Sequence, residues 1–400
     1  MAESQRPAPR PRSVPQPRSA PQPHSVPRPH AVPEPRSAPR PRLLHLAAAV
    51  DGAGQYQAPY FVELARLAER GMLDFVTLDD SLGPPGEGRG RLDALAVLSR
   101  VAPGTGRIGL VPTVTTTHTE PFHLSCAVAT LDWVSRGRAG WRAEVSTTEA
   151  EARLVGRRAA APAEELWEEA GEVADVAARL WDSWEDDAEI RDVATGRFID
   201  RDKLHYVDFE SARFSVRGPS IVPRPPQGHP VVVVDATDPV TRRTAARHAD
   251  VAYVRAATPQ AAGAIRDELR RRAVAHGRDE DALTVLAAVA ADLSDGEPAS
   301  ELPPPSGPLA ARTDGLPLYH GGPVDLAELI ARWHQAGAVD GFHITPVVPR
   351  RDLERFVNGT VALLQHRGLF RTFYPGATLR DHLGLARPAN RYVTAREAAR

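Results

Sequence analysis

The stretch Ile108–Ser146, IGLVPTVTTTHTEPFHLSCAVATLDWVSRGRAGWRAEVS, decides the fold. It begins with an apolar segment typical of a strand, Ile108–Val114, which ends in threonines. A helix is expected over Phe122–Val134, and a second strand ends near Ser146. The stretch is therefore a strand–helix–strand unit of about 40 residues, the repeat of a parallel sheet. Its polar groups gather where strands end, which is where such folds place their chemistry.

The same alternation recurs along the chain from residue 43. Eight strands are predicted, beginning near residues 43, 74, 108, 138, 231, 251, 283 and 341. Helices are predicted at 60–70, 92–101, 122–134, 162–184, 239–248, 258–276, 324–336 and 352–366. Eight alternating units in a chain of this length predict an α/β fold, a TIM (β/α)8 barrel.

Four segments differ from this repeat. Residues 1–42 form a Pro/Arg-rich hexapeptide repeat, and proline both removes amide donors and fixes φ, so a disordered, extended arm is expected. Within the barrel domain, residues 43–390, the polar segment 185–229 is interpreted as an insertion. Residues 294–322 are rich in proline and glycine, which predicts a loop. Residues 391–400 are expected to form a C-terminal tail.

Charge and cysteine content limit the classes of function. The net charge is −2, divided into +6 for residues 1–42 and −8 for the remainder. An acidic body argues against nucleic acid as the main partner, because phosphate binding needs clustered cations. No apolar run approaches the ~20 residues that span a membrane. The single cysteine, Cys126, excludes an internal disulfide and fits a reducing compartment, so we expect a cytoplasmic protein.

Polar side chains follow most of the predicted strands, and a barrel places them together at one mouth. They are Asp79, Asp80, Thr115–Thr117, His118, Glu120, Glu144–Ser146, Asp235–Asp238, Arg255, Asp292 and His343–Thr345. Hydroxyls and backbone amides at strand ends and helix starts suit a phosphate or a polar ring edge. Thr237-Asp238-Pro239 is equally well explained as a helix N-terminus.

Two hydrolase chemistries are alternatives on the same barrel. His118, Glu120, Asp79, Asp80 and His343 could ligate a metal, but no strand carries the paired His-x-His of barrel hydrolases. The carboxylates of Glu144 and Asp292 could instead serve as the acid pair of a glycosidase. No glycine-rich dinucleotide fingerprint follows any strand.

Several longer motifs occur in one order along residues 43–388. They are GRAGW at 137–141, LWDSWEDD at 180–187, PPQG at 225–228, AARHAD at 245–250, DGF at 340–342, RGLFR at 367–371 and TLRDHLGL at 378–385. With these motifs the chain resembles the bacterial luciferase-like flavin monooxygenases. It is most similar to the subgroup that acts on nitrilotriacetate, dibenzothiophene sulfone and pristinamycin precursors.

The resemblance implies a TIM barrel and a two-component reaction. A separate flavin reductase would supply reduced FMN, and the protein would hold the flavin, exclude water and use O2 to oxygenate a small organic substrate. Such chemistry explains why no nucleophile–base pair is visible, since the cofactor performs it. Members of the family often form homodimers, so a homodimer is expected.

The resemblance also implies a set of flavin-binding residues. The family aspartate after the second strand falls on Asp80, and a threonine after the third falls on Thr116. Both would contact the flavin ring or ribityl chain, while Ser146 and Thr237 would assist the phosphate. The remaining expected contacts are at Trp167 and Asp238.

The sequence departs from the family at the phosphate. The histidine and tyrosine that usually approach it fall on Ala163 and Trp167, and a Gly-Ser-Ser turn reads Ala236-Thr237-Asp238. Within GRAGW-Asn, the asparagine is replaced by Arg142. These changes leave a second hypothesis open: a luciferase-like barrel with a degenerate flavin site, acting as a non-catalytic partner or ligand-binding protein.

Overall fold

A computed structural model describes residues 44–52, 54–83, 90–294, 302 and 315–398. The arm expected over residues 1–42 and most of the loop expected over 294–322 lie outside the described residues. Within the described residues, no helix is both long enough and apolar enough to cross a bilayer.

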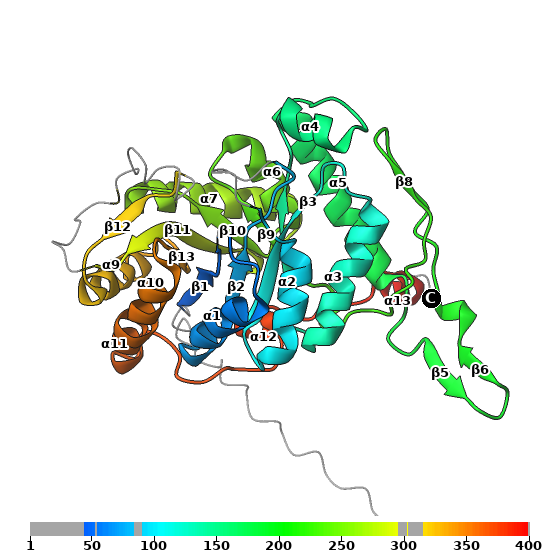
Figure 1. Ribbon diagram of the computed structural model, residues 1–400. Coiled ribbons are helices and arrows are strands. Elements are labelled where there is room, and N and C mark those ends of the chain that lie inside the picture. Colours follow the sequence, from blue (N-terminus) through cyan, green and yellow to red (C-terminus); the bar gives the residue numbers. More distant parts are fainter. Residues whose placement is uncertain (1–43, 53, 84–89, 295–301, 303–314, 399–400) are drawn as a thin grey trace, which may run out of the picture. The chain divides into compact units, whose positions relative to one another are not determined.

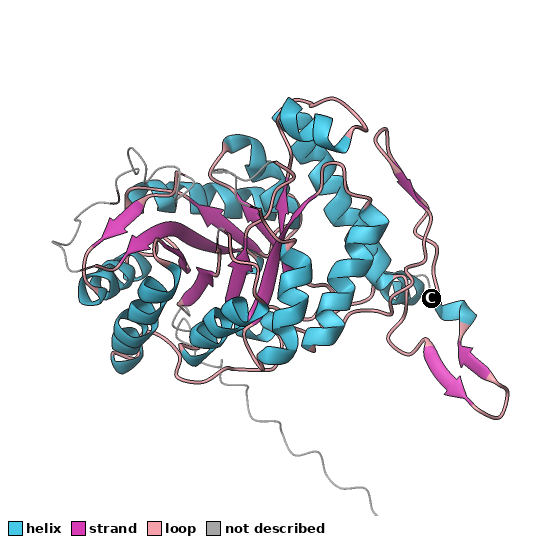
Figure 2. Ribbon diagram, viewed as in Figure 1, coloured by secondary structure: helices cyan, strands magenta, loops and turns pink. Residues whose placement is uncertain are grey.

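Eight parallel strands close into a barrel surrounded by helices (Figures 1 and 2). Each predicted strand is confirmed: β1 His45–Ala49, β2 Phe75–Leu78, β3 Gly109–Thr115, β4 Gly140–Glu144, β9 Val231–Asp235, β10 Val251–Val254, β11 Thr284–Asp292 and β13 Gly341–Pro346. The strands pair in the order β1-β2-β3-β4-β9-β10-β11-β13, and β13 pairs with β1 to complete the ring. The TIM barrel predicted from the sequence is therefore confirmed.

Alternate residues of each strand pack on the two sides of the barrel wall. Trp141 and Ala143 of β4 join the core between strands and helices, whereas Val233 and Tyr253 pack inside the barrel. At Gly341 the wall is so tight that a Cβ would lie 1.9 Å from the carbonyl oxygen of His45. Parallel strands buried on both faces need this continuous apolar character.

Helices cover the outside of the barrel, and each predicted helix is present with bounds that differ by up to a few residues. They are α1 Ala58–Arg70, α2 Ala94–Val101, α3 Pro121–Ser135, α5 Ala163–Asp182, α6 Pro239–His248, α7 Pro259–Ala275, α9 Pro323–Gln335, α10 Pro349–Arg355 and α11 Ala362–His366. Proline stands in the first turn of α1, α3, α6, α7, α9 and α10, where its missing N–H costs no hydrogen bond.

Some elements differ from the sequence-based prediction. A short helix α4, Glu149–Val155, was not predicted, and neither was α12, Leu379–His382. The closing helix, predicted to begin at residue 352, begins at Pro349 and contains a π-helical segment, Phe356–Val361. The segment 294–322 is not entirely loop, because β12, Leu318–His320, pairs in parallel with β11. Pairing with β11 supplies hydrogen bonds that no local pattern reveals.

The segment 185–229 contains two small hairpins. The first joins β5, Glu189–Asp192, to β6, Arg197–Ile199, and the second joins β7, Phe209–Glu210, to β8, Ser215–Val216. The β5–β6 hairpin projects away from the barrel wall (Figure 1).

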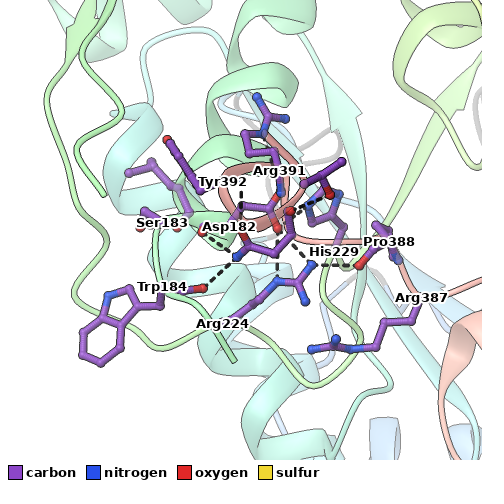
Figure 3. Close-up of polar contacts among 12 residues, drawn as sticks. Asp182, Ser183, Trp184, Arg224, His229, Arg387, Pro388, Arg391 and Tyr392 are labelled. Atoms are coloured by element: carbon purple, nitrogen blue, oxygen red, sulfur yellow. Dashed lines mark hydrogen bonds and ion pairs between the residues drawn. The ribbon is translucent and has the colours of Figure 1, made fainter. Parts of the chain in front are cut away.

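Residues 391–400, expected to be a tail, instead carry a helix, α13, Arg391–Ala398. The helix is held by a buried ion cluster, which we call the C-terminal clamp: Asp182, Arg224, His229 and Arg391 (Figure 3). The Asn390 amide also donates to the carbonyl oxygens of Asp182 and Trp184. This helix could not be expected from the sequence, because its partners lie about 200 residues away, beyond any local signal.

Candidate functional site

The carboxyl ends of the barrel strands carry charged side chains above an apolar floor. Arg142 of β4 is in register with Val233 of β9 and Thr113 of β3, and residues in register in a parallel sheet share a face. Val233 packs inside the barrel, so Arg142 also faces the interior. The site therefore begins inside the barrel, in register with the core residue Val233.

Arg142 is the centre of a group that we call the mouth cluster: Asp51, Asp79, Arg142, Glu144 and Tyr253. Its Nη2 lies 2.5 Å from Asp79 Oδ1 and 3.6 Å from Glu144 Oε2. Burial alone would lower the pKa of Arg142, but the charges of Asp79 and Glu144 outweigh burial and raise it. The guanidinium is thus permanently charged, and its Nε is buried with no hydrogen-bond partner in the described residues.

Asp51 holds a titratable proton in this cluster. Its Oδ1 accepts a hydrogen bond of 2.7 Å from the backbone N–H of Asp79. Burial, together with the negative charge of Asp79, raises the pKa of Asp51 to about 7. Two close carboxylates cannot both ionise cheaply, so one proton is retained near neutral pH.

A tyrosine completes the interior face. The Tyr253 ring packs against His343 at a centroid distance of 4.6 Å, and the His343 Nε2 lies 2.8 Å from Thr77 Oγ1. Burial lowers the pKa of His343 to about 3 and raises the pKa of Tyr253, so both rings are neutral. The buried Tyr253 hydroxyl has no partner within the described part of the chain.

The residues after β9 and β10 fix each other. Arg255 Nε lies 2.8 Å from Asp235 Oδ2, and the Arg255 amide donates to Thr237 Oγ1 at 2.9 Å. Asp238 caps α6 by accepting from the Val240 amide at 3.0 Å. Thr237 and Asp238, both predicted as cofactor contacts, therefore have structural roles at this strand end.

Asp80 and Thr116 are likewise tied to the backbone. The Asp80 carboxylate accepts from the amides of Ser81 and Ala94 and from Arg91 Nε, at 2.8, 2.9 and 3.0 Å. The Thr116 hydroxyl donates to the Glu144 carbonyl oxygen at 3.0 Å. Both residues thereby shape the loops after β2 and β3.

Ser146 and Trp167 contrast with these residues. Ser146 is 2% exposed, and its hydroxyl has no partner in the residues that the structure describes. The Trp167 side chain is buried in the core against the barrel, and its carbonyl oxygen accepts from Thr244 Oγ1 at 2.8 Å. Trp167 thus helps to dock α5 on α6.

The unpartnered atoms decide whether a flavin fits. Buried donors cost free energy unless something accepts from them. Arg142 Nε, the Tyr253 hydroxyl and the Ser146 hydroxyl all lie at or just after the carboxyl ends of strands, as do both ring nitrogens of His118. FMN offers carbonyl oxygens, ring nitrogens and phosphate oxygens as acceptors. The residues present therefore fit this cofactor.

The hydrolase alternatives have less support in the structure. Among the described residues, no group of three or more His, Cys, Asp or Glu side chains is arranged to hold a metal ion. Glu144 pairs with Arg142, whereas Asp292 pairs with Arg351 and His320, so the two carboxylates share no partner. Neither arrangement resembles a two-acid site around one bond.

Sequence reasoning missed three members of the mouth cluster as site residues. Asp51 follows β1 by two residues, and Tyr253 alternates with the inward-facing Val251. In the sequence, Arg142 stands out only as a departure from the family asparagine. The period of two along each strand would have placed Arg142 and Tyr253 inside the barrel.

Comparisons with known proteins agree with this architecture. The model of the luciferase-like monooxygenase family matches residues 41–299. Nitrilotriacetate monooxygenase component A of Aminobacter aminovorans is 33% identical over 83% of this chain and 90% of its own. This relative confirms the subgroup expected from the sequence motifs.

Solved structures show the same fold. EDTA monooxygenase from Chelativorans sp. BNC1 is 25% identical, with a TM-score of 0.76 over 86% of this chain and 99% of its own. A riboflavin lyase, solved with a modified FMN and riboflavin, is 23% identical, with a TM-score of 0.75 over 86% and 96% of the two chains. Together with the match of the family model, these similarities show that the chain belongs to the luciferase-like monooxygenase family.

Proposed function

We propose that the chain is the oxygenase component of a two-component, FMN-dependent monooxygenase. Reduced FMN would come from a separate flavin reductase, and O2 would be used to oxygenate a small organic substrate. Bound FMN would supply the oxygen activation, a reaction that protein side chains do not perform. The observation that carries the proposal is the set of unpartnered buried donors at the mouth of a luciferase-like barrel.

Arg142 and Tyr253 of the mouth cluster would bind and orient the flavin ring. Arg142 Nε and the Tyr253 hydroxyl are donors already desolvated by the barrel, so a ring acceptor placed there gains hydrogen bonds without further loss of water. Asp51 would hold a proton at its carboxyl group near neutral pH. The apolar floor below, with Val233 and Val251, would exclude water from one side.

The residues expected from the family would act around this centre. Asp80 and Thr116 would contact the ring or ribityl chain while holding the loops after β2 and β3. Ser146 and Thr237 would assist the phosphate, beside Trp167 and Asp238. Because Asp238 already caps α6, its carboxylate is committed to the Val240 amide.

A titration of the full chain with FMN tests this function. Oxidised FMN is followed by quenching of its fluorescence, and reduced FMN is followed anaerobically by quenching of protein tryptophan fluorescence. The proposal expects saturable binding, tighter for reduced FMN, and O2-dependent oxygenation of a substrate when a flavin reductase is added. A protein that binds neither form at about 100 µM, a Kd equivalent to only about −5.5 kcal/mol, would instead be the non-catalytic barrel.

The hydrolase alternatives are tested separately. A Glu144→Gln variant that loses a hydrolytic activity present in the wild type would contradict the proposal. Retention of FMN binding by the same variant would support it, because Glu144 lies 3.6 Å from Arg142 and not at its unpartnered Nε.

We further propose that the protein is a cytoplasmic homodimer. Large apolar side chains are exposed on the C-terminal end of α3 and on the β5–β6 hairpin, with Trp133 47% and Phe198 55% exposed. Exposed apolar patches of this kind mark protein interfaces. Sedimentation equilibrium should give twice the chain mass of 43.3 kDa, and a Phe198→Ser variant should weaken the association.

A further inference from the structure

A second group of polar side chains lies beside the mouth, next to the first half of α5. We call it the anion corner: His118 after β3, Ser146 after β4, and Arg158, which pairs with Glu169 of α5. The hydrogen bond from the Ser146 amide to Thr117 Oγ1, 3.1 Å long, brings the first two strand ends together. The resemblance to the family assigns none of its expected phosphate contacts to His118 or Arg158.

His118 is held in an unfavourable backbone conformation. Its φ is +67°, a left-handed value that few residues other than glycine adopt, and strain of this kind is common at functional sites. Both ring nitrogens are buried and lack partners in the described residues. Burial, then the charge of Arg158, lowers the pKa of His118, so the neutral ring presents one N–H donor.

Ser146 presents a second unused donor. The residue is 2% exposed, and its hydroxyl finds no acceptor among the residues that the structure describes. A buried hydroxyl is normally hydrogen-bonded, so a partner from outside the chain explains both Ser146 and His118.

Arg158 supplies a guanidinium whose charge is paired with that of Glu169. Its two terminal nitrogens lie 2.8 and 2.7 Å from the carboxylate oxygens of Glu169, which fixes the guanidinium plane. A guanidinium has five N–H donors, so this pair leaves donors available for an anion. Three further charges act on the pKa of His118: the carboxylates of Glu169 and Glu151 raise it, and Arg157 lowers it.

We propose that His118, Ser146 and Arg158 form the binding site for the phosphate of flavin mononucleotide. The inference rests on the proposed function and extends it to residues that the family resemblance does not indicate. An imidazole, a hydroxyl and a guanidinium are groups that phosphate oxygens accept from. They replace the histidine and tyrosine that the family places at Ala163 and Trp167.

Comparing FMN with riboflavin isolates the phosphate, because the two ligands differ by that group alone. Dissociation constants of both are measured by fluorescence quenching with the full chain. Wild type should bind FMN at least about tenfold more tightly than riboflavin, since charge-assisted hydrogen bonds are among the stronger contacts. The quantity that tests the proposal is the ratio of the two dissociation constants, riboflavin to FMN, and not enzymatic activity.

Two variants test the named residues. Arg158→Gln is combined with Glu169→Gln, so that no buried carboxylate is left unpaired, and His118→Asn keeps a residue that tolerates positive φ. Each should reduce the ratio about threefold or more and leave riboflavin binding unchanged. Arg153→Gln, which removes an exposed arginine of α4, is the matched control and should keep the wild-type ratio.

Other results of these titrations would contradict either the phosphate site or the proposed function. If wild type binds both flavins equally, or if the variants keep the wild-type ratio, the anion corner is not the phosphate site although flavin binding stands. If neither flavin binds, the proposed function fails and the corner with it.

Discussion

The mouth cluster and the C-terminal clamp are both clusters of charged side chains, but they differ in what their atoms contact. In the clamp, the Asp182 carboxylate lies 3.0 Å from both Arg224 and His229 and 3.4 Å from Arg391. Its partners come from distant parts of the chain and are all protein groups (Figure 3). In the mouth cluster, Arg142 Nε and the Tyr253 hydroxyl have no such partner among the described residues.

This difference separates a structural cluster from a binding site. Burial alone would raise the pKa of Asp182, yet His229 and Arg224 lower it, so the folded protein stabilises the charge. At Asp51 burial and a neighbouring carboxylate instead raise the pKa to about 7. A carboxyl group with a pKa raised towards neutrality, beside buried donors that lack partners, is typical of functional sites.

The largest effect is expected in the clamp. Asp182→Ala removes one of the two counter-charges of Arg224, which is 4% exposed and keeps its pair with Asp186, and it also removes the carboxylate that pairs with His229 and Arg391. Breaking a buried ion pair in this way costs about 3–5 kcal/mol, so the free energy of unfolding should fall by that amount. Denaturant titration measures it. The control is Asp187→Ala, which breaks an exposed pair with Lys203 and should lower the free energy of unfolding by under about 1 kcal/mol. Equal losses of stability in the two variants would contradict the role of the clamp.

The next effect separates the two clusters by ligand binding. Arg142→Gln removes a charged donor from the mouth and should weaken FMN binding about tenfold. Arg224→Gln should lower stability but leave FMN affinity unchanged in the folded fraction. The dissociation constants of both variants, measured below their unfolding temperatures, provide the check. Equal weakening by the two substitutions would show that the distinction between the clusters is mistaken.

A smaller effect is expected from Tyr253→Phe. The hydroxyl lacks a partner in the described residues, so its removal should leave the stability of the free protein within about 1 kcal/mol of wild type. FMN affinity should fall about three- to tenfold, because the lost hydrogen bond forms only with the ligand. Parallel thermal unfolding and fluorescence titration separate the two quantities. A strongly destabilised variant with normal FMN binding is the result that opposes this assignment.

The last effect is a pH dependence of stability from Asp51. Its folded pKa is raised, so the folded state holds this proton more strongly than the unfolded state does. Its contribution to stability is therefore present in acid and is lost as pH rises from about 4 towards 7. Asp51→Asn lacks this loss, so its stability relative to wild type should increase between pH 5 and 8. A constant difference across that range is incompatible with a raised pKa.

The barrel could be predicted from the sequence because its signals are local. Val231–Val234 is an apolar run of strand length, and Pro239 marks the start of the next helix. Strand β12 and helix α13 could not be predicted, because one depends on pairing with β11 and the other on Asp182 and Glu185. Both partners are distant in the chain.

The site was predictable in position but not in detail. Asp79 and Glu144 follow or end strands, so a barrel necessarily brings them to its mouth. Side chains alternate between the two faces of a strand, so a barrel also turns Arg142 to the interior, where it can link these two carboxylates. The sequence cannot reveal that the Tyr253 hydroxyl is left without a partner, because this depends on side chains from several strands. The commitment of Asp238 to capping α6 was foreseeable from Thr237-Asp238-Pro239.

The most direct measurement is a crystal structure of the full chain with FMN. The account predicts the flavin ring over the barrel mouth, with an acceptor atom within hydrogen-bond distance of both Arg142 Nε and the Tyr253 hydroxyl, about 2.7–3.2 Å. A structure in which Arg142 and Asp79 occupy the mouth unchanged, with FMN absent or bound elsewhere, would contradict it.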